Sequence, residues 1–288
     1  MAYRPLFRAV AAAFAVFTLL GVAAQPTQAH GPGPDGHAAE ARYLGNEGVL
    51  VIHGETKVLF DAFYRQGFGQ YALVPDNLER ALLEGSAPFN GVDALFVSHF
   101  HGDHFTPRPV LAFLRSQPEV PLFAPLQAVD LLREAVAADD PVLDRVNAVA
   151  LTPGDPPFQT TLGALLIEAV AIPHSGGARR ASVQNLAWRV TLDGDATAAH
   201  FGDADPADIH FAPYQAYWDA RVTHVAFPPY WFFGTENGRA ILSDRIKARQ
   251  AIGVHVPHRA ARDPDAWSHR LDADLFTSPG DIRVIALE

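Results

Sequence analysis

The sequence predicts a mixed fold of the α+β class. Two features indicate it: short apolar runs follow one another early in the chain, and further runs then alternate with amphipathic segments of helical period. The first two runs are separated by Gly54-Glu55, a pair that favours a tight hairpin. Periodicity alone indicates only a mixture of α and β elements around one core.

Strands and helices are both expected along most of the chain. Strand signals occur, in chain order, at 49–53, 57–61, 94–98, 120–123, 146–151, 165–172, 183–192, 198–201, 222–227, 251–256 and 282–287. Helix signals occur at 75–84, 107–116, 125–137, 237–249 and 264–274. No linker divides the chain after Tyr43, and 288 residues suffice for one large core, so we expect a single domain over 43–288.

The N-terminal segment is expected to lie outside that domain. Arg4 and Arg8 precede an apolar stretch at 9–24, and Thr27-Gln28-Ala29 offers a small-residue cleavage site before His30. This pattern predicts a secretory signal peptide over 1–29, cleaved near Ala29. An uncleaved anchor is the alternative, although a membrane span usually needs ~20 apolar residues.

The segment after the expected cleavage site is rich in Gly and Pro. We therefore expect a flexible tail over 30–42. The mature protein is then periplasmic or secreted, without stable membrane insertion. The sequence contains no Cys, so it has no disulfide framework.

The net charge of the chain limits the kinds of molecule that we expect it to bind. The net charge is −10, and no run of basic residues exceeds Arg179-Arg180. An acidic chain without a basic stripe is a poor nucleic-acid binder. We expect a small-molecule substrate, and the sequence leaves the oligomeric state open.

The most informative segment reads His-Phe-His-Gly-Asp-His at residues 99–104, directly after the apolar run at 94–98. Such a density of imidazole and carboxylate is hard to assign to packing, because each buried polar group would need its own partner. Ligands of these types suit Zn, Fe or Mn. The segment therefore predicts a metal site at the end of a buried strand.

The spacing within this segment has a geometric meaning. His99 and His101 are two residues apart, so they point the same way after a strand and can hold one metal ion. Gly102 allows a sharp turn. Asp103 and His104 are then carried to a neighbouring position, where a second ion can bind.

The segment resembles the His-x-His-x-Asp-His signature of the metallo-β-lactamase superfamily, and the other motifs of that family occur in the expected order. The matching residues each follow an apolar run, and they are Asp61, His174, Asp203 and His255. Asp61 resembles the first-motif Asp, which braces the metal loop. The resemblance runs from about Tyr43 to the C-terminus. It implies a four-layer αβ/βα sandwich, in which two sheets pack together with helices outside.

The resemblance also implies two divalent metal ions, Zn in the first place, with Mn or Fe as alternatives. The implied ligands are His99, His101 and His174 for one ion, Asp103, His104 and His255 for the other, and Asp203 as the bridge. A water between the ions loses a proton near neutral pH and becomes the nucleophile. The β-lactam-cleaving members commonly use a Cys at the second ion, and this chain has none. That role therefore falls to Asp or His.

We expect a binuclear metal-dependent hydrolase that acts on a small ester, lactone or phosphodiester. The expected catalytic residues are Asp103 and Asp203, with Tyr230 as a donor to the developing oxyanion. For Tyr230 the alternative is a packed aromatic cluster. Two other functions stay open: a mononuclear iron oxygenase of the same superfamily, and a non-catalytic periplasmic metal-binding protein.

Two further expectations concern the rim of the site. His258 is the rival of His255 as the last ligand, and we prefer His255 because it directly follows an apolar run. The aromatic segment 64–71 contains Gly67 and Gly69 and is expected to form a mobile flap over the site.

Overall fold

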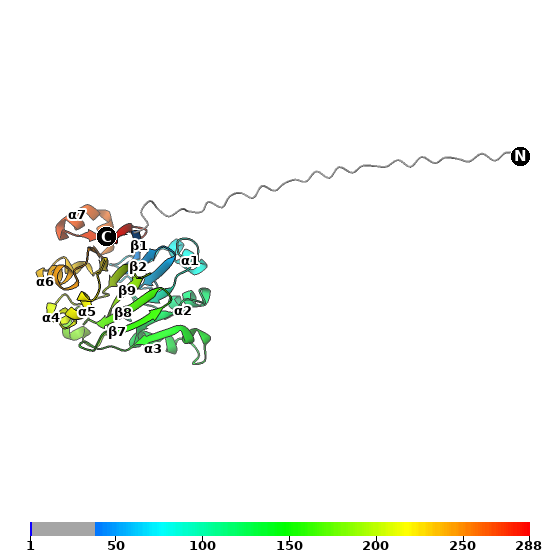
Figure 1. Ribbon diagram of the computed structural model, residues 1–288, viewed down its shortest axis with the longest axis horizontal. Coiled ribbons are helices and arrows are strands. Elements are labelled where there is room, and N and C mark those ends of the chain that lie inside the picture. Colours follow the sequence, from blue (N-terminus) through cyan, green and yellow to red (C-terminus); the bar gives the residue numbers. More distant parts are fainter. Residues whose placement is uncertain (2–37) are drawn as a thin grey trace. The chain divides into compact units, whose positions relative to one another are not determined.

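The computed structural model describes residue 1 and residues 38–288, and the latter contain two seven-stranded sheets. Figure 1 shows the strands between two groups of helices. This arrangement confirms the predicted α+β class and the four-layer αβ/βα sandwich. The expected signal peptide over 1–29, apart from its first residue, lies outside the described residues, as does the expected tail up to residue 37.

The first sheet has the strand order β14-β1-β2-β3-β4-β5-β6. Its strands are β1 (Ala38–Gly45), β2 (Gly48–His53), β3 (Thr56–Phe60), β4 (Ala94–Phe96), β5 (Leu122–Pro125), β6 (Val146–Val149) and β14 (Ile282–Ala286). Strands β14, β1, β2 and β3 pair antiparallel, whereas β3, β4, β5 and β6 pair parallel. The parallel strands therefore end at one common edge of the sheet.

The second sheet has the order β13-β12-β11-β10-β9-β8-β7. Its strands are β7 (Phe158–Leu162), β8 (Leu165–Ala171), β9 (Leu186–Leu192), β10 (Ala196–His200), β11 (Val225–Phe227), β12 (Gln250–Gly253) and β13 (Asp274–Leu275). Strands β10 to β13 run parallel, and β7 to β10 run antiparallel. Loops that follow β10 and β12 thus leave the same edge.

The helices form the outer layers. Those that pack on the first sheet are α1 (Asp76–Glu84), α2 (Pro107–Ser116) and α3 (Leu126–Glu134). Those on the second sheet are α4 (Asp208–Phe211), α5 (Gln215–Asp219), α6 (Glu236–Ala240) and α7 (Pro264–Leu271). The helix expected at 237–249 is α6 followed by a π-turn over Ile241–Ile246. Among the described residues, no helix is long and apolar enough to cross a membrane.

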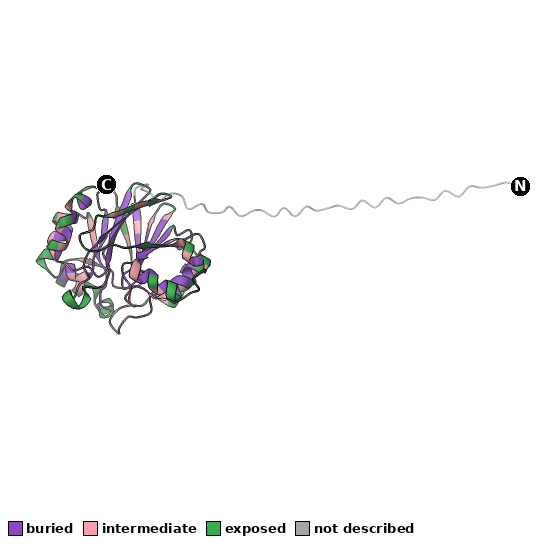
Figure 2. Ribbon diagram, turned by 90° about the horizontal axis from the view of Figure 1, so that it is seen from below, coloured by how far each residue is buried: buried purple, intermediate pink, exposed green. Residues whose placement is uncertain are grey.

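The core explains why the parallel strands are apolar throughout. In β4, Ala94 and Phe96 face the other sheet, while Leu95 faces the helices, so both faces of the strand are buried. Between the sheets, Phe96 packs against Phe60 and Trp188, with ring centroids 5.2 and 5.1 Å apart. Figure 2 shows buried residues along the strands and exposed ones on the outer faces of the helices.

One boundary expected from the sequence is wrong. The tail predicted over 30–42 includes residues 38–42, which belong to β1 and pair with both β2 and β14. Ala39 and Ala41 are buried between the sheets. Because alanine is small, its alternation with the charged Glu40 and Arg42 is a weak strand signal. The domain therefore begins at least five residues before Tyr43.

Candidate metal centre

The loop after β4 presents its polar side chains at the edge where the parallel strands end. The chain tightens there, since the His104 and Phe105 N–H groups donate to the His101 carbonyl over 3.0 and 2.8 Å. Gly102 lies against the segment after β3, and a Cβ on it would stand 2.7 Å from Gln66 Cγ. The turn predicted at Gly102 thus depends on the absence of a side chain.

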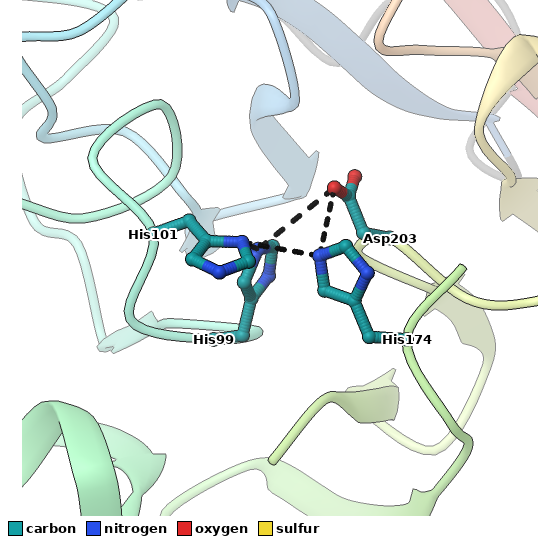
Figure 3. A group of neighbouring side chains, drawn as sticks. All are labelled: His99, His101, His174 and Asp203. Atoms are coloured by element: carbon teal, nitrogen blue, oxygen red, sulfur yellow. Dashed lines mark hydrogen bonds and ion pairs between the residues drawn. The ribbon is translucent and has the colours of Figure 1, made fainter. Parts of the chain in front are cut away.

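A first cluster, which we call the first metal group, consists of His99, His101, His174 and Asp203 (Figure 3). His101 Nδ1 lies 3.0 Å from His99 Nε2 and 3.1 Å from His174 Nε2. His174 Nε2 lies 3.1 Å from Asp203 Oδ2. Ligand atoms around a tetrahedral zinc ion with ~2.05 Å bonds stand ~3.3 Å apart. The group therefore has the dimensions of a metal site.

A second cluster, the second metal group, consists of Glu47, His104, His255 and Asp203. Asp203 Oδ1 lies 3.3 Å from His104 Nε2 and 3.1 Å from His255 Nε2. Asp103 joins this group, because its Oδ2 is 3.3 Å from His255 Nε2 and 3.8 Å from His104 Nε2. All seven metal ligands expected from the sequence are thus brought together, and Glu47 is an addition to them.

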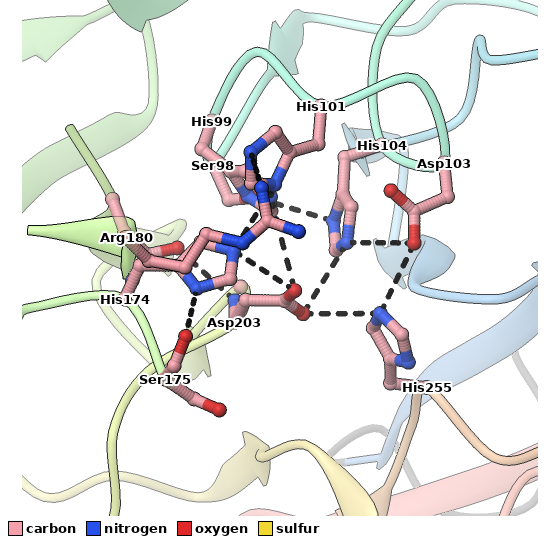
Figure 4. Close-up of polar contacts among 12 residues, drawn as sticks. Ser98, His99, His101, Asp103, His104, His174, Ser175, Arg180, Asp203 and His255 are labelled. Carbon is pink, nitrogen blue, oxygen red and sulfur yellow. Dashed lines mark hydrogen bonds and ion pairs between the residues drawn. The ribbon is translucent and has the colours of Figure 1, made fainter. Parts of the chain in front are cut away.

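Asp203 belongs to both groups, with one oxygen towards each (Figure 4). It follows β10, and its N–H donates to Asn185 Oδ1 over 3.0 Å. Gly202 brings the chain close to Ser98, with a φ of +53° and no room for a Cβ, which would lie 2.5 Å from Ser98 Cβ. The backbone before Asp203 is therefore fixed by packing against the loop that carries His99.

Hydrogen bonds decide which imidazole nitrogens face the groups. The Nδ1 atoms of His104 and His174 are held by Asp61 Oδ2 at 2.8 Å and by the Ser175 carbonyl. Each Nε2 then faces the cluster as the nitrogen that can bind a cation, the arrangement seen behind metal-bound histidines. Asp61 also accepts from the Ser98 N–H and hydroxyl. It therefore braces the loop, as the resemblance implied.

Unsatisfied buried atoms converge on the second metal group. They are both carboxylate oxygens of Glu47, His104 Nε2, Asp203 Oδ1 and both ring nitrogens of His255. Buried polar atoms without partners are rare in folded proteins, because each costs about 1–3 kcal/mol. A divalent cation accepts lone pairs from such nitrogens and oxygens. The residues therefore fit the metal that the resemblance implies.

The protonation states differ between the groups. Burial lowers the pKa of His99, and burial together with His174 lowers the pKa of His101 to about 4. Burial also acts to lower the pKa of His255, but the Asp203 and Asp103 carboxylates outweigh it and raise the pKa to about 10. A cation that enters the second metal group therefore displaces the proton of His255, whereas the imidazoles of His99 and His101 are already neutral.

A third cluster, Glu47 with Asp61 and His200, does not have the character of a metal site. His200 Nε2 donates to the Glu47 carbonyl over 2.9 Å. Asp61 is engaged by Ser98 and His104. Both residues thus have partners of their own, and His200 supports the turn at Glu47.

Of the residues expected at the rim of the site, His258 and Tyr230 lie against other parts of the chain, and Tyr71 contacts a ligand. His258 is exposed and its Nδ1 bonds to the Gln70 carbonyl over 2.8 Å, so His255 and not His258 stands in the cluster. The Tyr230 ring lies against Trp231 and Trp267, which accords with the aromatic-cluster alternative. Tyr71, at the end of the expected flap, packs edge-on against His255 with centroids 4.0 Å apart.

Two residues near the groups were not predicted from the sequence. Glu47 occupies the turn between β1 and β2, where an acid usually indicates exposure to solvent. Arg180 lies in a 3₁₀ turn, Gly177–Arg180, and its Nη1 is 3.3 Å from His101 Nε2. In the sequence, the pair Arg179-Arg180 stands out only as a short basic run. It carries no signal that one of the two residues faces the metal groups.

The comparisons with known proteins agree with this geometry. Residues 56–256 match the family described as the beta-lactamase superfamily domain. No curated protein sequence matches the chain.

Solved structures with a similar fold come from several organisms. A metallo hydrolase from the hyperthermophilic archaeon Ignicoccus hospitalis has a TM-score of 0.56 and 15% identity, over 87% of this chain and 100% of that one. The short form of human tRNase Z has a TM-score of 0.53 and 12% identity, over 86% and 99%. CmlA, a diiron beta-hydroxylase from Streptomyces venezuelae, has a TM-score of 0.50 and 15% identity, over 89% and 55%. At such identities the likeness concerns the fold alone.

Proposed function

The chain belongs to the beta-lactamase superfamily of metal-dependent hydrolases, and on this premise we propose that it is a binuclear hydrolase of small esters, lactones or phosphodiesters. The observation that carries the proposal is Asp203, whose two oxygens face two different sets of imidazoles. Two divalent cations bound there bring the pKa of a shared water near neutrality and polarise the substrate oxygen. Zn suits the imidazole-rich first metal group, and Mn or Fe are the alternatives.

The chain's own residues have separate tasks in this proposal. Asp203 offers an oxygen to each group and offsets the repulsion between the two positive charges. Asp103 stands beside His255, with its Oδ2 3.3 Å from His255 Nε2, and its carboxylate would accept the proton of the attacking water. Tyr71, whose ring packs against His255, is a further candidate beside Tyr230 to donate to a developing oxyanion.

Arg180 supports a substrate with an anionic oxygen. When His101 presents an unprotonated Nδ1 to the first metal group, its Nε2 carries the ring proton and cannot accept from Arg180. That nitrogen is the one hydrogen-bond partner of the Arg180 side chain among the described residues. The guanidinium is then available to a phosphoryl or carboxylate oxygen. Phosphodiesters and acid-bearing esters fit this feature better than neutral esters.

A substrate panel tests the proposal. The metal-loaded protein is assayed with neutral esters, acid-bearing esters, lactones, phosphodiesters and a β-lactam, and kcat/KM is compared. We expect the highest values for anionic esters or phosphodiesters and weak or absent turnover of the β-lactam. Arg180→Ala should raise KM for the anionic substrates alone, and Arg179→Ala is the matched control. A β-lactam value far above all others contradicts the proposal.

A second candidate function is an iron-dependent oxygenase. The carboxylate-rich second metal group favours it, because such ligands also suit iron. The likeness in fold to a protein described as a diiron beta-hydroxylase points the same way. Elemental analysis of the protein as purified, together with oxygen consumption, separates the two candidates: iron with oxygen uptake supports the oxygenase.

We also propose that the protein is exported, that it carries no stable membrane insertion after processing, and that it does not bind nucleic acid. The support is the pattern of residues 1–29 and the net charge of −10. Intact mass after native expression tests export. A mature N-terminus near His30 in the periplasm or medium is expected, and a membrane fraction that retains Met1 would mean an anchor.

A further inference from the structure

The turn between β1 and β2 is buried, although hairpin turns normally lie at the surface. Asn46 and Glu47 form this turn, and both are 0% exposed. The Asn46 side chain donates to the Asp103 carbonyl over 2.9 Å, and the Asn46 carbonyl accepts from the His255 N–H over 3.0 Å. The turn is therefore inserted between the two loops that carry the ligands of the second metal group.

Within this turn, the Glu47 carboxyl group has no hydrogen-bond donor among the described residues, and both of its oxygens are buried. A buried carboxylate without a partner is strongly unfavourable. Its oxygen lies within 4.8 Å of ligand atoms on His104, His255 and Asp203. Each of these three residues also has at least one buried polar atom without a hydrogen-bond partner.

The neighbouring imidazoles do not supply the missing partner. His104 Nδ1 is 3.7 Å from Glu47 Oε2 but only 2.8 Å from Asp61 Oδ2, so its N–H donates to Asp61. His200 Nε2 is 3.6 Å from Glu47 Oε2 and directs its proton at the Glu47 main-chain carbonyl instead. Both of these imidazoles thus direct their protons to other acceptors.

We propose that Glu47 is a further carboxylate ligand of the cation in the second metal group. The inference rests on the binuclear function proposed above. Ligand atoms on opposite sides of a cation with ~2.1 Å bonds stand ~4.2 Å apart, so separations within 4.8 Å suit a five- or six-coordinate ion after a small side-chain movement.

The consequence is a difference between the two cations. The first metal group offers three imidazoles and one oxygen of Asp203. With Glu47, the second offers three carboxylates against two imidazoles, the others being Asp103 and Asp203. Carboxylate-rich sites suit oxygen-preferring cations, so this position accommodates Mn²⁺ or Fe²⁺ better than the imidazole-rich first metal group does.

The test is a cation titration of the full chain after removal of bound metal. MnCl₂ is titrated into wild type and Glu47→Gln by calorimetry, and EPR records whether two Mn²⁺ ions are spin-coupled. In wild type we expect two bound Mn²⁺ ions. In Glu47→Gln we expect one of the two affinities to fall roughly 100-fold, the other to change less than about threefold, and the coupled signal to disappear. Glu47→Met, which cannot bind a hard cation, should behave in the same way.

Metal-free stability distinguishes a ligand from a structural residue. An unpaired buried acid is replaced by a neutral isostere in Glu47→Gln, so the metal-free variant should be at least as stable as wild type. Glu168→Gln is the matched control, because Glu168 is also buried but is paired with Arg189 at 3.0 Å. That variant should lose metal-free stability and keep both Mn²⁺ affinities.

Three results would overturn the inference or its premise. Unchanged Mn²⁺ affinities in Glu47→Gln and Glu47→Met would show that Glu47 is not a ligand. Equal weakening of both ions, with a less stable metal-free protein, would assign Glu47 a structural role. A wild-type protein that binds a single cation would instead refute the binuclear function itself.

Discussion

At the scale of single residues, the centre depends most on Asp203. Its carboxylate faces the imidazoles of both metal groups and is held by Asn185 from behind. Burial opposes its negative charge, but His255 and His104 outweigh this and keep its pKa well below the usual range. The residue is therefore charged at any working pH, which is what a bridge between two cations requires.

Asp203→Asn keeps the shape of the side chain and removes its charge. We expect weaker binding of at least one cation, and a kcat lowered on the order of a hundredfold or more, because a main electrostatic stabiliser is lost. Metal content by elemental analysis and steady-state kinetics measure the two effects. Near-normal values for both would mean that the bridge lies elsewhere.

His101→Ala should remove the cation of the first metal group and abolish activity, since His101 Nδ1 stands between the other two imidazoles. The expected metal content falls from about two equivalents to about one. His258→Ala is the control, because His258 is exposed and bonds to the chain outside the cluster. An active His101→Ala protein with full metal content is incompatible with the assignment.

Four of the residues found from the sequence share one property: each lies within two residues of the end of an apolar strand signal. His99, His174, Asp203 and His255 are of this kind, and the structure brings them together. Glu47 was not found because its burial depends on the turn between β1 and β2 being covered by two distant loops. Arg180 was not found because its orientation is set by a short 3₁₀ turn that has no periodic signal.

At the scale of elements, prediction succeeded where a strand is buried on both faces. At the sheet edges it succeeded for β6 and β14 but not for β7 and β13. The interior strands β3, β4, β8 and β11 were expected from continuous apolar runs. The edge strand β7 was not, since its sequence Phe-Gln-Thr-Thr-Leu is half polar and partly exposed. A margin strand needs only one apolar face, and a short alternating pattern resembles a loop.

The connection after β10 gives a test at this scale. Gly202 has a φ of +53°, and a Cβ there would stand 2.5 Å from both Asn185 Oδ1 and Ser98 Cβ. Gly202→Ala should therefore displace the chain that positions Asp203, lower the melting temperature and reduce metal content. Gly194→Ala is the matched control: its φ is +79°, but nothing lies within 4 Å of the added Cβ. We expect that control to show only backbone strain, about 1–2 kcal/mol, with full metal content. Equal metal content in the two variants would contradict the argument.

At the scale of the whole domain, the metal centre joins the two sheets. His99, His101, Asp103 and His104 come from the loop after β4 in the first sheet, whereas His174, Asp203 and His255 follow strands of the second sheet. Cations bound between them therefore stabilise the packing of one half on the other. When the free cation concentration is 100 times the dissociation constant, binding adds about 2.7 kcal/mol per site to the free energy of unfolding. Chelation should lower the melting temperature, and added Mn²⁺ or Zn²⁺ should restore it.

Above neutral pH, the stability of the metal-free protein should fall as the pH rises, whereas the stability of the metal-loaded protein should rise. In the metal-free protein the pKa of His255 is raised to about 10, above its ordinary value of 6.5, by Asp203 and Asp103 acting against burial. The protonated His255 therefore makes its full contribution to the free energy of unfolding below pH 6.5. This contribution is lost as the pH rises towards 10, by up to about 1.4 kcal/mol per pH unit. A bound cation takes the place of that proton, so the loaded protein gains metal affinity over the same range. Thermal unfolding from pH 6.5 to 10, with chelator and with excess Mn²⁺, measures both slopes. His255→Gln should reduce the alkaline loss in chelator, and the remainder belongs to His104, whose pKa is also raised because Asp203 and Asp103 outweigh burial. A metal-free wild type whose stability stays level to pH 10 would refute the assigned proton.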